Sequence, residues 1–343
     1  MRFPKGVPGA LLTAATVCAC LSVARAQETV VIVGSGSSIP TELYRAWANG
    51  FNALKGPIRA QYMPSGASDG IWTTVAGNGD FAAGEIPSDA AQLHGPKISL
   101  LPIPMALVGI VPLYNLPTER ALNFSGGLLA QIYLGSVKNW KDPQIAKLNP
   151  NVDLPDLPIR VVHRGPGTGS NFIFTDFLSK SDPQFRTAVG RSASPRWPVG
   201  LIADHRHAMV ALVAATPGAI GYVDLAAAHN SGVRYGAVEN ASGRFITATA
   251  ATLEAAYNAA ANSRTGDLSL VITNAPGKDS YPIASFTWMY VPMSGTPLAR
   301  RHALKEFLLW GLQDGQKVTT ALGYAPLPGR IAAQALAAVN ALP

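Results

Sequence analysis

The sequence predicts an α/β protein, and three observations support this class. Short apolar strand patterns alternate with helix patterns along the chain. Several of these strands end in a turn rich in glycine and serine that leads directly into a helix. The chain has 343 residues, which is enough to bury one large core or two lobes.

The first 26 residues have the pattern of a secretory signal peptide. Arg2 and Lys5 precede an apolar run, and Ala24-Arg25-Ala26 is a small-x-small cleavage site. The run is too short for a stable transmembrane helix, and no later stretch is apolar enough to span a bilayer. We therefore expect an exported protein that is cleaved near Ala26.

Both cysteines of the chain, Cys18 and Cys20, lie inside this segment. The mature protein is therefore expected to contain no disulfide, and its stability must come from packing. Lipid anchoring at Cys20, with residues 17–20 as the lipid box, is an alternative. The Ala-Arg-Ala site is favoured over it because it fits the cleavage pattern more closely.

The charge of the chain fits a small anionic ligand and excludes a nucleic-acid interface. The formal charge is +7, and loss of Arg2, Lys5 and Arg25 leaves +4. Nucleic-acid binding requires clustered basic residues with interleaved aromatics, and no such patch is present. The six histidines include one close pair, His205 and His207, so we expect neither a metal site nor a cofactor.

The first strand–turn–helix unit begins at the mature N-terminus. Residues 29–33 form a strand pattern that ends in a turn containing Ser37 and Ser38. Pro40 occupies a position typical of the first helical turn. Leu43, Trp47 and Phe51 then share one face of the predicted helix.

The next two strands end in similar turns. Residues 58–63 are a strand pattern followed by a turn at 65–70, which contains Ala67 and Ser68, and by a short helix. Residues 79–87 contain a strand that ends with Glu85 at its tip.

The strongest copy of this design spans residues 160–180. A strand ends at Arg164, a glycine-rich turn follows, and a helix begins near Ser170. A helix N-terminus presents unpaired N–H groups and a partial positive charge, which suit an anion. Arg164 adds a charged guanidinium, while Thr168 and Ser170 add hydroxyl donors. The spacing therefore predicts an oxyanion site.

The remaining patterns complete the α/β assignment. An apolar, proline-broken segment at 101–113 is expected to pass between lobes as strands. Helices are expected at 124–133, 142–148, 208–215 and 298–312, and strands at 218–223 and 283–291. In the last helix, Leu304, Leu308 and Leu312 should face the core.

A serine hydrolase is the alternative from another class. Residues 66–70 fit the G-x-S-x-G nucleophile elbow, with Ser68 as the nucleophile after a predicted strand. The pattern is short and the chain contains 33 glycines, so chance matches are expected. The turn at 165–170 is not a nucleotide-binding loop, because no Gly-Lys-Ser/Thr follows it.

Seven segments together resemble the periplasmic phosphate-binding proteins of bacterial ABC phosphate importers. They occur in the order of that family and span nearly the whole mature chain. The segments are GSGSSIP (34–40), YMPSGASDGI (62–71), DFAAGEIP (80–87), IYLGSVKNWKDPQIAKLNP (132–150), VVHRGPGTGSNFIFTDFLSK (161–180), TPGAIGYVD (216–224) and YPIASFTWMYV (281–291).

This resemblance implies a two-lobed periplasmic binding protein fold, type II-like, with a hinge and the ligand in the interlobe cleft. It places lobe one at 27–108 plus 275–343 and lobe two at 109–274. The implied function is capture of inorganic phosphate, or a mimic such as arsenate, for an ABC permease and ATPase by a monomer without enzymatic activity. A secreted phosphate scavenger without a transporter is the alternative.

The resemblance also assigns the ligand-binding residues. They lie in the glycine-rich and serine-rich turns and at the strand tip: Ser37, Ser38, Ala67, Ser68, Glu85, Arg164, Thr168, Gly169 and Ser170.

Three positions and one loop depart from the family pattern. Ala67 replaces a usual serine ligand, so that only its backbone N–H remains. Glu85 replaces an aspartate, and Pro166 replaces a second acid beside the arginine. Residues 204–207, Asp-His-Arg-His, replace a loop rich in glycine and asparagine. These changes bear on the preference among oxyanions.

Glu85 is expected to decide that preference. A carboxylate in the pocket accepts the proton of hydrogen phosphate, whereas it repels sulfate, which has no proton to donate. We therefore predict phosphate or arsenate over sulfate.

Overall fold

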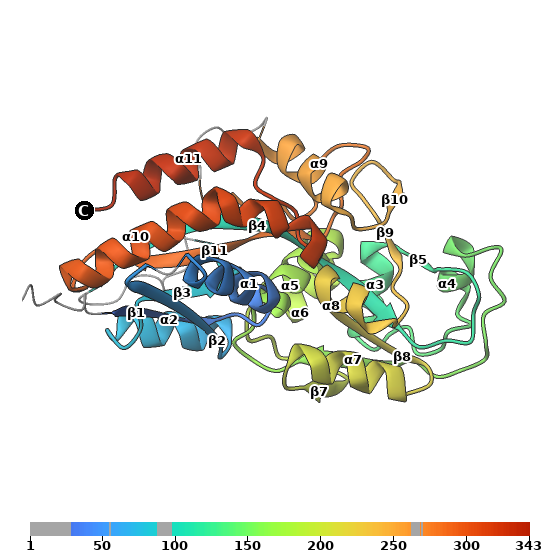
Figure 1. Ribbon diagram of the computed structural model, residues 1–343. Coiled ribbons are helices and arrows are strands. Elements are labelled where there is room, and N and C mark those ends of the chain that lie inside the picture. The colour runs from blue at the N-terminus through green and yellow to red at the C-terminus, as the bar shows by residue number, and fades with distance from the viewer. Residues whose placement is uncertain (1–28, 55, 88–97, 262–267, 269) are drawn as a thin grey trace, which may run out of the picture.

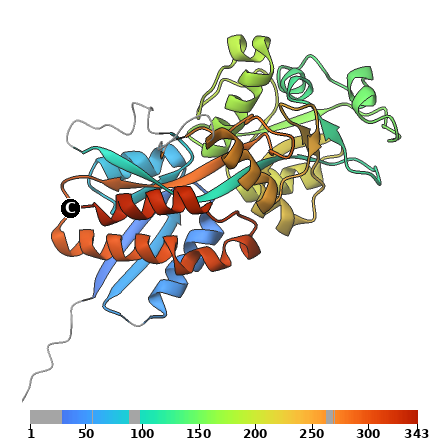
Figure 2. The ribbon, with the colours of Figure 1, turned by 90° about the horizontal axis from the view of Figure 1, so that it is seen from above.

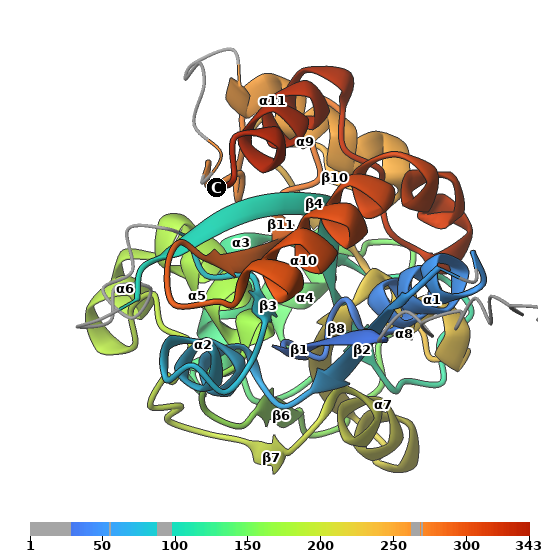
Figure 3. The same cartoon turned by 60° about the vertical axis from the view of Figure 1, so that its left-hand side comes forward.

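The computed structural model describes residues 29–54, 56–87, 98–261, 268 and 270–343. The predicted signal peptide, its cleavage near Ala26 and the lipid-anchor alternative at Cys20 lie outside these residues. The fold is a mixed α/β fold with a curled sheet and helices on both sides of it (Figures 1 and 3). The large sheet has eight strands in the order β2 (Ile58–Pro64), β1 (Val30–Gly36), β3 (Phe81–Gly84), β11 (Ala284–Pro292), β4 (Leu100–Tyr114), β8 (Ala219–Asp224), β6 (Arg160–Arg164) and β7 (Leu201–Ala203).

The strand directions bring two sets of turns together in the middle of the molecule. β1, β2 and β3 are parallel to one another, and so are β6, β7 and β8. β11 is antiparallel to β3 and β4, and β4 is antiparallel to β8. β1–β3 therefore run toward the second half of the sheet, while β6–β8 run toward the first. The turns at the carboxyl ends of both sets meet between the halves, which is where α/β sheets bind ligands.

β4 is one continuous strand that crosses from one half to the other, as Figure 2 shows. It pairs with β11 through Gly109 and with β8 from Ile110 onward. The prediction of strand structure at 101–113 that passes from one half to the other is confirmed, but the expected breaks at the prolines were wrong. The register against β11 shifts beside Pro104, and such a bulge is one place where a strand tolerates proline.

Helices of the first half pack on strands β1, β2, β3 and β4. They are α1 (Thr41–Asn52), α2 (Ala67–Val75), α10 (Leu298–Leu312) and α11 (Gly329–Asn340), with the short 3-10 helices η2 (Asp314–Val318) and η3 (Thr320–Leu322). The predicted core faces are confirmed. α1 buries Leu43, Trp47 and Phe51, and α10 buries Leu304, Leu308 and Leu312.

The second half contains seven helices in the described part of the chain and a small sheet. The helices are α3 (Gly126–Tyr133), α4 (Pro143–Leu148), α5 (Gly169–Ser181), α6 (Pro183–Ala188), α7 (Arg206–Ala215), α8 (Leu225–Ser231) and α9 (Ala250–Ala261), and the sheet order is β10 (Phe245–Ile246), β9 (Ala237–Glu239), β5 (Asn123–Phe124). The helix predicted from residue 124 begins at Gly126 instead. Phe124 belongs to β5, and the Ser125 hydroxyl caps α3 by accepting a hydrogen bond from the Leu128 N–H at 3.2 Å.

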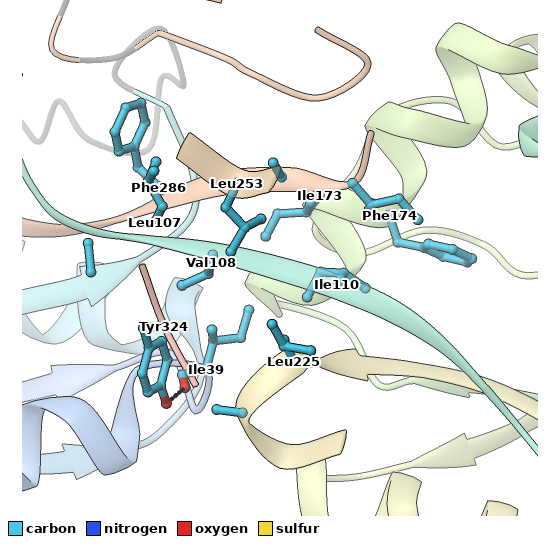
Figure 4. Close-up of a cluster of buried hydrophobic side chains, with 14 of the residues drawn as sticks. Ile39, Leu107, Val108, Ile110, Ile173, Phe174, Leu225, Leu253, Phe286 and Tyr324 are labelled. Carbon is cyan, nitrogen blue, oxygen red and sulfur yellow. Dashed lines mark hydrogen bonds between the residues drawn. The ribbon is translucent and has the colours of Figure 1, made fainter. Parts of the chain in front are cut away.

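The two halves share a continuous apolar core at their junction. Figure 4 shows Ile39 and Tyr324 from the first half close to Val108 of β4 and Leu225 of the second half. These four side chains are at most 8% exposed. Within the described residues, no helix is both long enough and apolar enough to cross a bilayer.

Candidate functional site

A pocket of about 490 Å³ opens between the two sets of turns. The first half contributes Ser38, Gly66 and Asp69 to its lining, and the second half contributes Arg164, Thr168 and Asp204. Residues of both strand sets thus line one pocket, as the strand directions require.

The turn after β1 is held tightly by its own hydrogen bonds. The Ser37 N–H donates to the Ala83 carbonyl at 2.8 Å, and the Ser37 hydroxyl accepts from the Ile39 N–H at 3.1 Å. The Ser38 carbonyl accepts from the Thr41 hydroxyl at 2.9 Å. Ser37 is buried, whereas Ser38 reaches the pocket wall.

Arg164 is buried at the end of β6 and is directed at the pocket. Its Nε donates to the Ala203 carbonyl and its Nη2 to the Asp204 carbonyl, both at 3.1 Å. Nη1 finds no acceptor among the described residues, so one edge of the guanidinium remains available. Burial lowers the pKa of Arg164 from its usual value, although the group remains a cation at neutral pH.

The turn between β6 and α5 is shaped by a side chain that sequence reasoning missed. Asn171 Nδ2 donates to the Gly165 carbonyl at 2.7 Å and to the Ala193 carbonyl at 3.1 Å. The Tyr222 hydroxyl donates to Asn171 Oδ1 in turn. Thr168 is the N-cap of α5, and its hydroxyl accepts from the Asn171 N–H at 3.4 Å.

Several backbone N–H groups around these turns have no acceptor in the part of the chain that the structure describes, and four of them belong to predicted site residues. These four are the N–H groups of Ser38, Ala67, Gly169 and Ser170. Ala67 and Gly169 are the first residues of α2 and α5, so their N–H groups lie at helix N-termini. Unpaired amides at helix N-termini are suited to an anion.

Glu85 lies fully buried among these donors. A Cβ atom built on Gly169 would come within 1.8 Å of Glu85 Oε2, so this carboxyl group lies directly against the start of α5. The hydroxyls of Ser37 and Thr287 lie near it, but neither carboxyl oxygen has a partner with hydrogen-bond geometry among the described residues. Burial raises the pKa of Glu85 to about 8, and the two hydroxyls only partly offset this.

The two halves touch directly at the site. The Ser68 N–H donates to the Gly167 carbonyl at 3.1 Å, joining the turn before α2 to the turn before α5. The Ser68 backbone is therefore engaged in holding the turns together, and its hydroxyl makes no hydrogen bond to a histidine in the described chain. The arrangement lacks the nucleophile–base contact that the serine hydrolase alternative requires.

Seven of the nine predicted residues are buried, and only Ser38, Arg164 and Thr168 line the pocket. We give the name inner wall to five of the buried ones: Ser37, Ala67, Glu85, Arg164 and Gly169. Ser38 and Thr168 line the pocket beside the inner wall, Ser68 joins the two turns, and Ser170 follows Gly169 in α5. We call a second set the outer mouth, because its members line the pocket but are exposed: Arg45, Asp69, Asp204, His205 and His207.

Arg206 is the main residue that the sequence did not reveal. It belongs to the tetrapeptide at 204–207, and a run of charged residues usually marks a solvated loop. In the structure Arg206 is 3% exposed and reaches the first half, where its Nη1 donates to the carbonyls of Ser38 and Ile39 at 3.0 and 3.2 Å. His205, the N-cap of α7, stays exposed. The described residues contain no group of three or more potential metal ligands.

Comparison with known proteins places this site in context. The model of the PBP superfamily domain matches residues 23–314. The phosphate-binding protein PstS of Xylella fastidiosa strain Temecula1 is 34% identical over 309 residues, covering 90% of this chain and 84% of that protein. The phosphate-binding protein PstS of Pasteurella multocida is 33% identical over 307 residues, covering 89% and 88%.

Solved structures show the same fold. A high-affinity periplasmic phosphate-binding protein, PfluDING, bound with phosphate, has a TM-score of 0.73 at 20% identity, covering 91% of this chain and 96% of that one. A phosphate-binding protein from Stenotrophomonas maltophilia has a TM-score of 0.70 at 18% identity, covering 90% and 94%. The predicted two-lobed fold is therefore confirmed.

Proposed function

The chain belongs to the PstS phosphate-binding proteins of the PBP superfamily, and we propose that it captures inorganic phosphate between its lobes and delivers it to an ABC importer. The observation that carries this proposal is the convergence of unpaired donors from both halves. The amides of Ala67 and Gly169 lie at two helix N-termini whose turns are joined by the Ser68–Gly167 hydrogen bond, and Arg164 lines the pocket between the two halves. Such donors stabilise a tetrahedral oxyanion that has lost its water.

The free energy of the proposed hydrogen bonds is large enough for micromolar binding of phosphate. Micromolar affinity requires about 8 kcal/mol net. Hydrogen bonds to a charged group contribute roughly 1.5–3 kcal/mol each, before the costs of association. In our proposal the phosphate oxygens accept hydrogen bonds from the Arg164 guanidinium, from the amides of Ala67 and Gly169, and from the hydroxyls of Thr168 and Ser170. The remaining proposed ligand-binding residues are Ser37, Ser38 and Ser68.

Glu85 is proposed to select among anions by sharing one proton with the ligand. The sequence predicts an ionised carboxylate at Glu85, but a pKa of about 8 keeps the ligand-free Glu85 side chain protonated at neutral pH. Protonated Glu85 can donate to phosphate or to sulfate. Once Glu85 ionises, a hydrogen bond between its carboxylate and the anion requires a proton on the anion. Hydrogen phosphate and hydrogen arsenate carry that proton, whereas sulfate does not. Preference for phosphate over sulfate should therefore increase as the pH rises through 8.

Pro166 adds to this pH dependence in our proposal. It stands where the family has a second acid, so the site is more positive by one charge. We expect discrimination to be weaker, or more sensitive to pH, than with two acids present. The same phosphate affinity at pH 5 and pH 8 would contradict this.

The proposal extends to the setting of the protein. We propose a periplasmic monomer that serves a permease and an ATPase, and that has no enzymatic activity. The lobes are proposed to be 27–108 plus 275–343 and 109–274, with the hinge where β4 changes partners at Gly109–Ile110. A free scavenger with the same site is the second candidate, and permease and ATPase genes beside this gene would argue against it.

Titration calorimetry of the mature chain tests the proposal. Phosphate and arsenate should bind one per chain at micromolar concentration or below. Sulfate and methylphosphonate should bind more weakly, and the gap between phosphate and sulfate should widen from pH 6 to pH 9. Sulfate binding as tight as phosphate at both pH values would refute the selectivity, and no phosphate binding would refute the function.

A further inference from the structure

Arg206 connects the two halves at the anion-binding turn of the first half. It is the first residue of α7, in the second half. Its guanidinium donates from Nη1 to the Ser38 carbonyl at 3.0 Å and to the Ile39 carbonyl at 3.2 Å. Because Arg206 is 3% exposed, these bonds are shielded from water and are stronger than surface bonds of the same geometry.

The other side of the guanidinium is anchored within the second half. Nη2 lies 3.2 Å from Asp224 Oδ1, and Asp224 is 1% exposed at the end of β8. The same oxygen accepts a hydrogen bond from the Ala227 N–H at 3.0 Å, which fixes the carboxylate as the N-cap of α8. Arg206 is thus held by its own half while it reaches into the other.

Tyr324 supports the same turn from the first half. Its hydroxyl donates to the Ile39 carbonyl at 2.7 Å, the bond drawn as a dashed line in Figure 4. Tyr324 is 2% exposed, and its side chain lies beside the Arg206 guanidinium. The Ile39 carbonyl therefore receives donors from both halves in this closed arrangement.

These bonds orient the peptide unit between Ser38 and Ile39. A trans peptide directs its carbonyl and its N–H to opposite sides. With the Ser38 carbonyl turned to Arg206, the Ile39 N–H turns to the Ser37 hydroxyl at 3.1 Å, which lies near Glu85 in the inner wall. The guanidinium thus fixes which side of this turn faces Glu85.

We propose that Arg206 is a positioning residue for anion capture: it orients the Ser38–Ile39 turn and stabilises the closed state of the two lobes. The proposal rests on the proposed function, because closure matters only if the cleft holds a ligand. When the lobes separate, Arg206 retains its ion pair with Asp224 but loses its hydrogen bonds to the carbonyls of Ser38 and Ile39. Loss of these contacts should raise the population of the open state and shorten the lifetime of the bound anion.

The test compares Arg206→Gln with Arg45→Gln. Arg45 is exposed in the outer mouth, so its variant loses the same charge at the same pocket without touching either carbonyl. Stopped-flow and calorimetry with inorganic phosphate should show a dissociation rate at least tenfold faster in Arg206→Gln and an affinity weaker by a similar factor. Arg45→Gln should change both by less than threefold, and Arg206→Lys should recover part of the loss.

A second readout needs no ligand. Both cysteines of the chain precede the predicted mature start, so spin labels can be introduced specifically at Asn78→Cys and Lys147→Cys, which are exposed positions in different halves. In ligand-free protein, Arg206→Gln should shift the distance distribution toward the open state relative to the labelled parent. This result is independent of whether phosphate is the ligand, so it separates failure of this proposal from failure of the proposed function.

Tyr324→Phe covers the case in which Arg206→Gln does not fold. It removes one donor to the Ile39 carbonyl and keeps the ring in the core. A smaller increase in the phosphate dissociation rate is expected, with an unchanged distance distribution in the bound state. Wild-type dissociation rates and wild-type distances in both Arg206→Gln and Tyr324→Phe would overturn the proposal.

Discussion

The buried inner wall and the exposed outer mouth use similar residue types in different environments. Glu85 and Arg164 of the inner wall are 0% and 5% exposed, and burial shifts the pKa of both groups. The outer mouth also carries both signs of charge, from Arg45, Asp69 and Asp204, but these side chains are exposed. Water and salt screen charges at the mouth, whereas buried charges interact at low dielectric. We therefore expect burial, rather than residue type, to decide which ionisable residues control phosphate binding.

The largest effect is expected for Glu85→Gln on stability. The native state keeps its Glu85 proton up to a pKa of about 8, whereas an unfolded glutamate loses it near pH 4.3. Between these values the native state binds more protons, so stability decreases as pH rises, by up to about 5 kcal/mol in total. Ligand-free Glu85→Gln should lack this decrease and be more stable than the parent at pH 8.5.

Urea unfolding of phosphate-free protein between pH 5 and pH 9 measures this. Glu254→Gln, at an exposed position of α9, is the matched control and should follow the parent. If Glu85→Gln shows the parent's pH profile, Glu85 is not the buried acid that the comparison requires.

Arg164→Gln should give the next largest effect, on phosphate affinity. Loss of one or two charge-assisted hydrogen bonds costs about 3 kcal/mol, or roughly 100-fold in the dissociation constant. Arg160→Gln, at the exposed start of the same strand, should change affinity by less than threefold. Calorimetry at 0.15 M salt distinguishes them, and equal effects of the two changes would mean that burial does not matter.

Gly169→Ala should weaken phosphate binding about tenfold. The backbone tolerates alanine at a helix start, but the new methyl group would overlap Glu85 Oε2, which lies 1.8 Å away from its position. The carboxyl group must move, which displaces it from the anion. Gly127→Ala in α3, where a Cβ meets nothing within 4 Å, is the control. Unchanged phosphate affinity in Gly169→Ala would show that Glu85 does not face the ligand.

The smallest effects are expected at the outer mouth. Asp69→Asn and Arg45→Gln should each change phosphate affinity by less than threefold at 0.15 M salt, because exposed charges are screened over about 8 Å. The changes should grow in 0.02 M salt, whereas those at the inner wall should not. A tenfold change in phosphate affinity in either variant at 0.15 M salt would contradict the difference expected between the inner wall and the outer mouth.

Much of the fold could be predicted because its signals are local. The glycine- and serine-rich turns, the apolar runs before them and the apolar face of α10 are all encoded within short windows. The unbroken course of β4 was not predicted, because its prolines signal breaks locally, whereas its pairing with β11 and β8 depends on residues more than 100 positions away. Tertiary pairing overrode the local preference.

The candidate site was predictable in residue type but not in environment. The motifs indicate residues 37–38, 67–68, 85, 164 and 168–170 as ligands, and this role stays a prediction. They could not show that Glu85 is buried deeply enough to hold its proton. Arg206 was missed because a run of charged residues usually marks a solvated loop. Only the fold reveals that this arginine turns inward to Ser38 while its histidine neighbours stay exposed.

The most direct test of the account is a crystal structure of the mature protein grown with phosphate. Tetrahedral density should lie between the halves, within hydrogen-bond distance of the Arg164 guanidinium and the amides of Ala67 and Gly169, with one oxygen on the Glu85 carboxyl group. Density found only beside His205 and His207 at the outer mouth, with the inner wall closed on itself, would contradict the account.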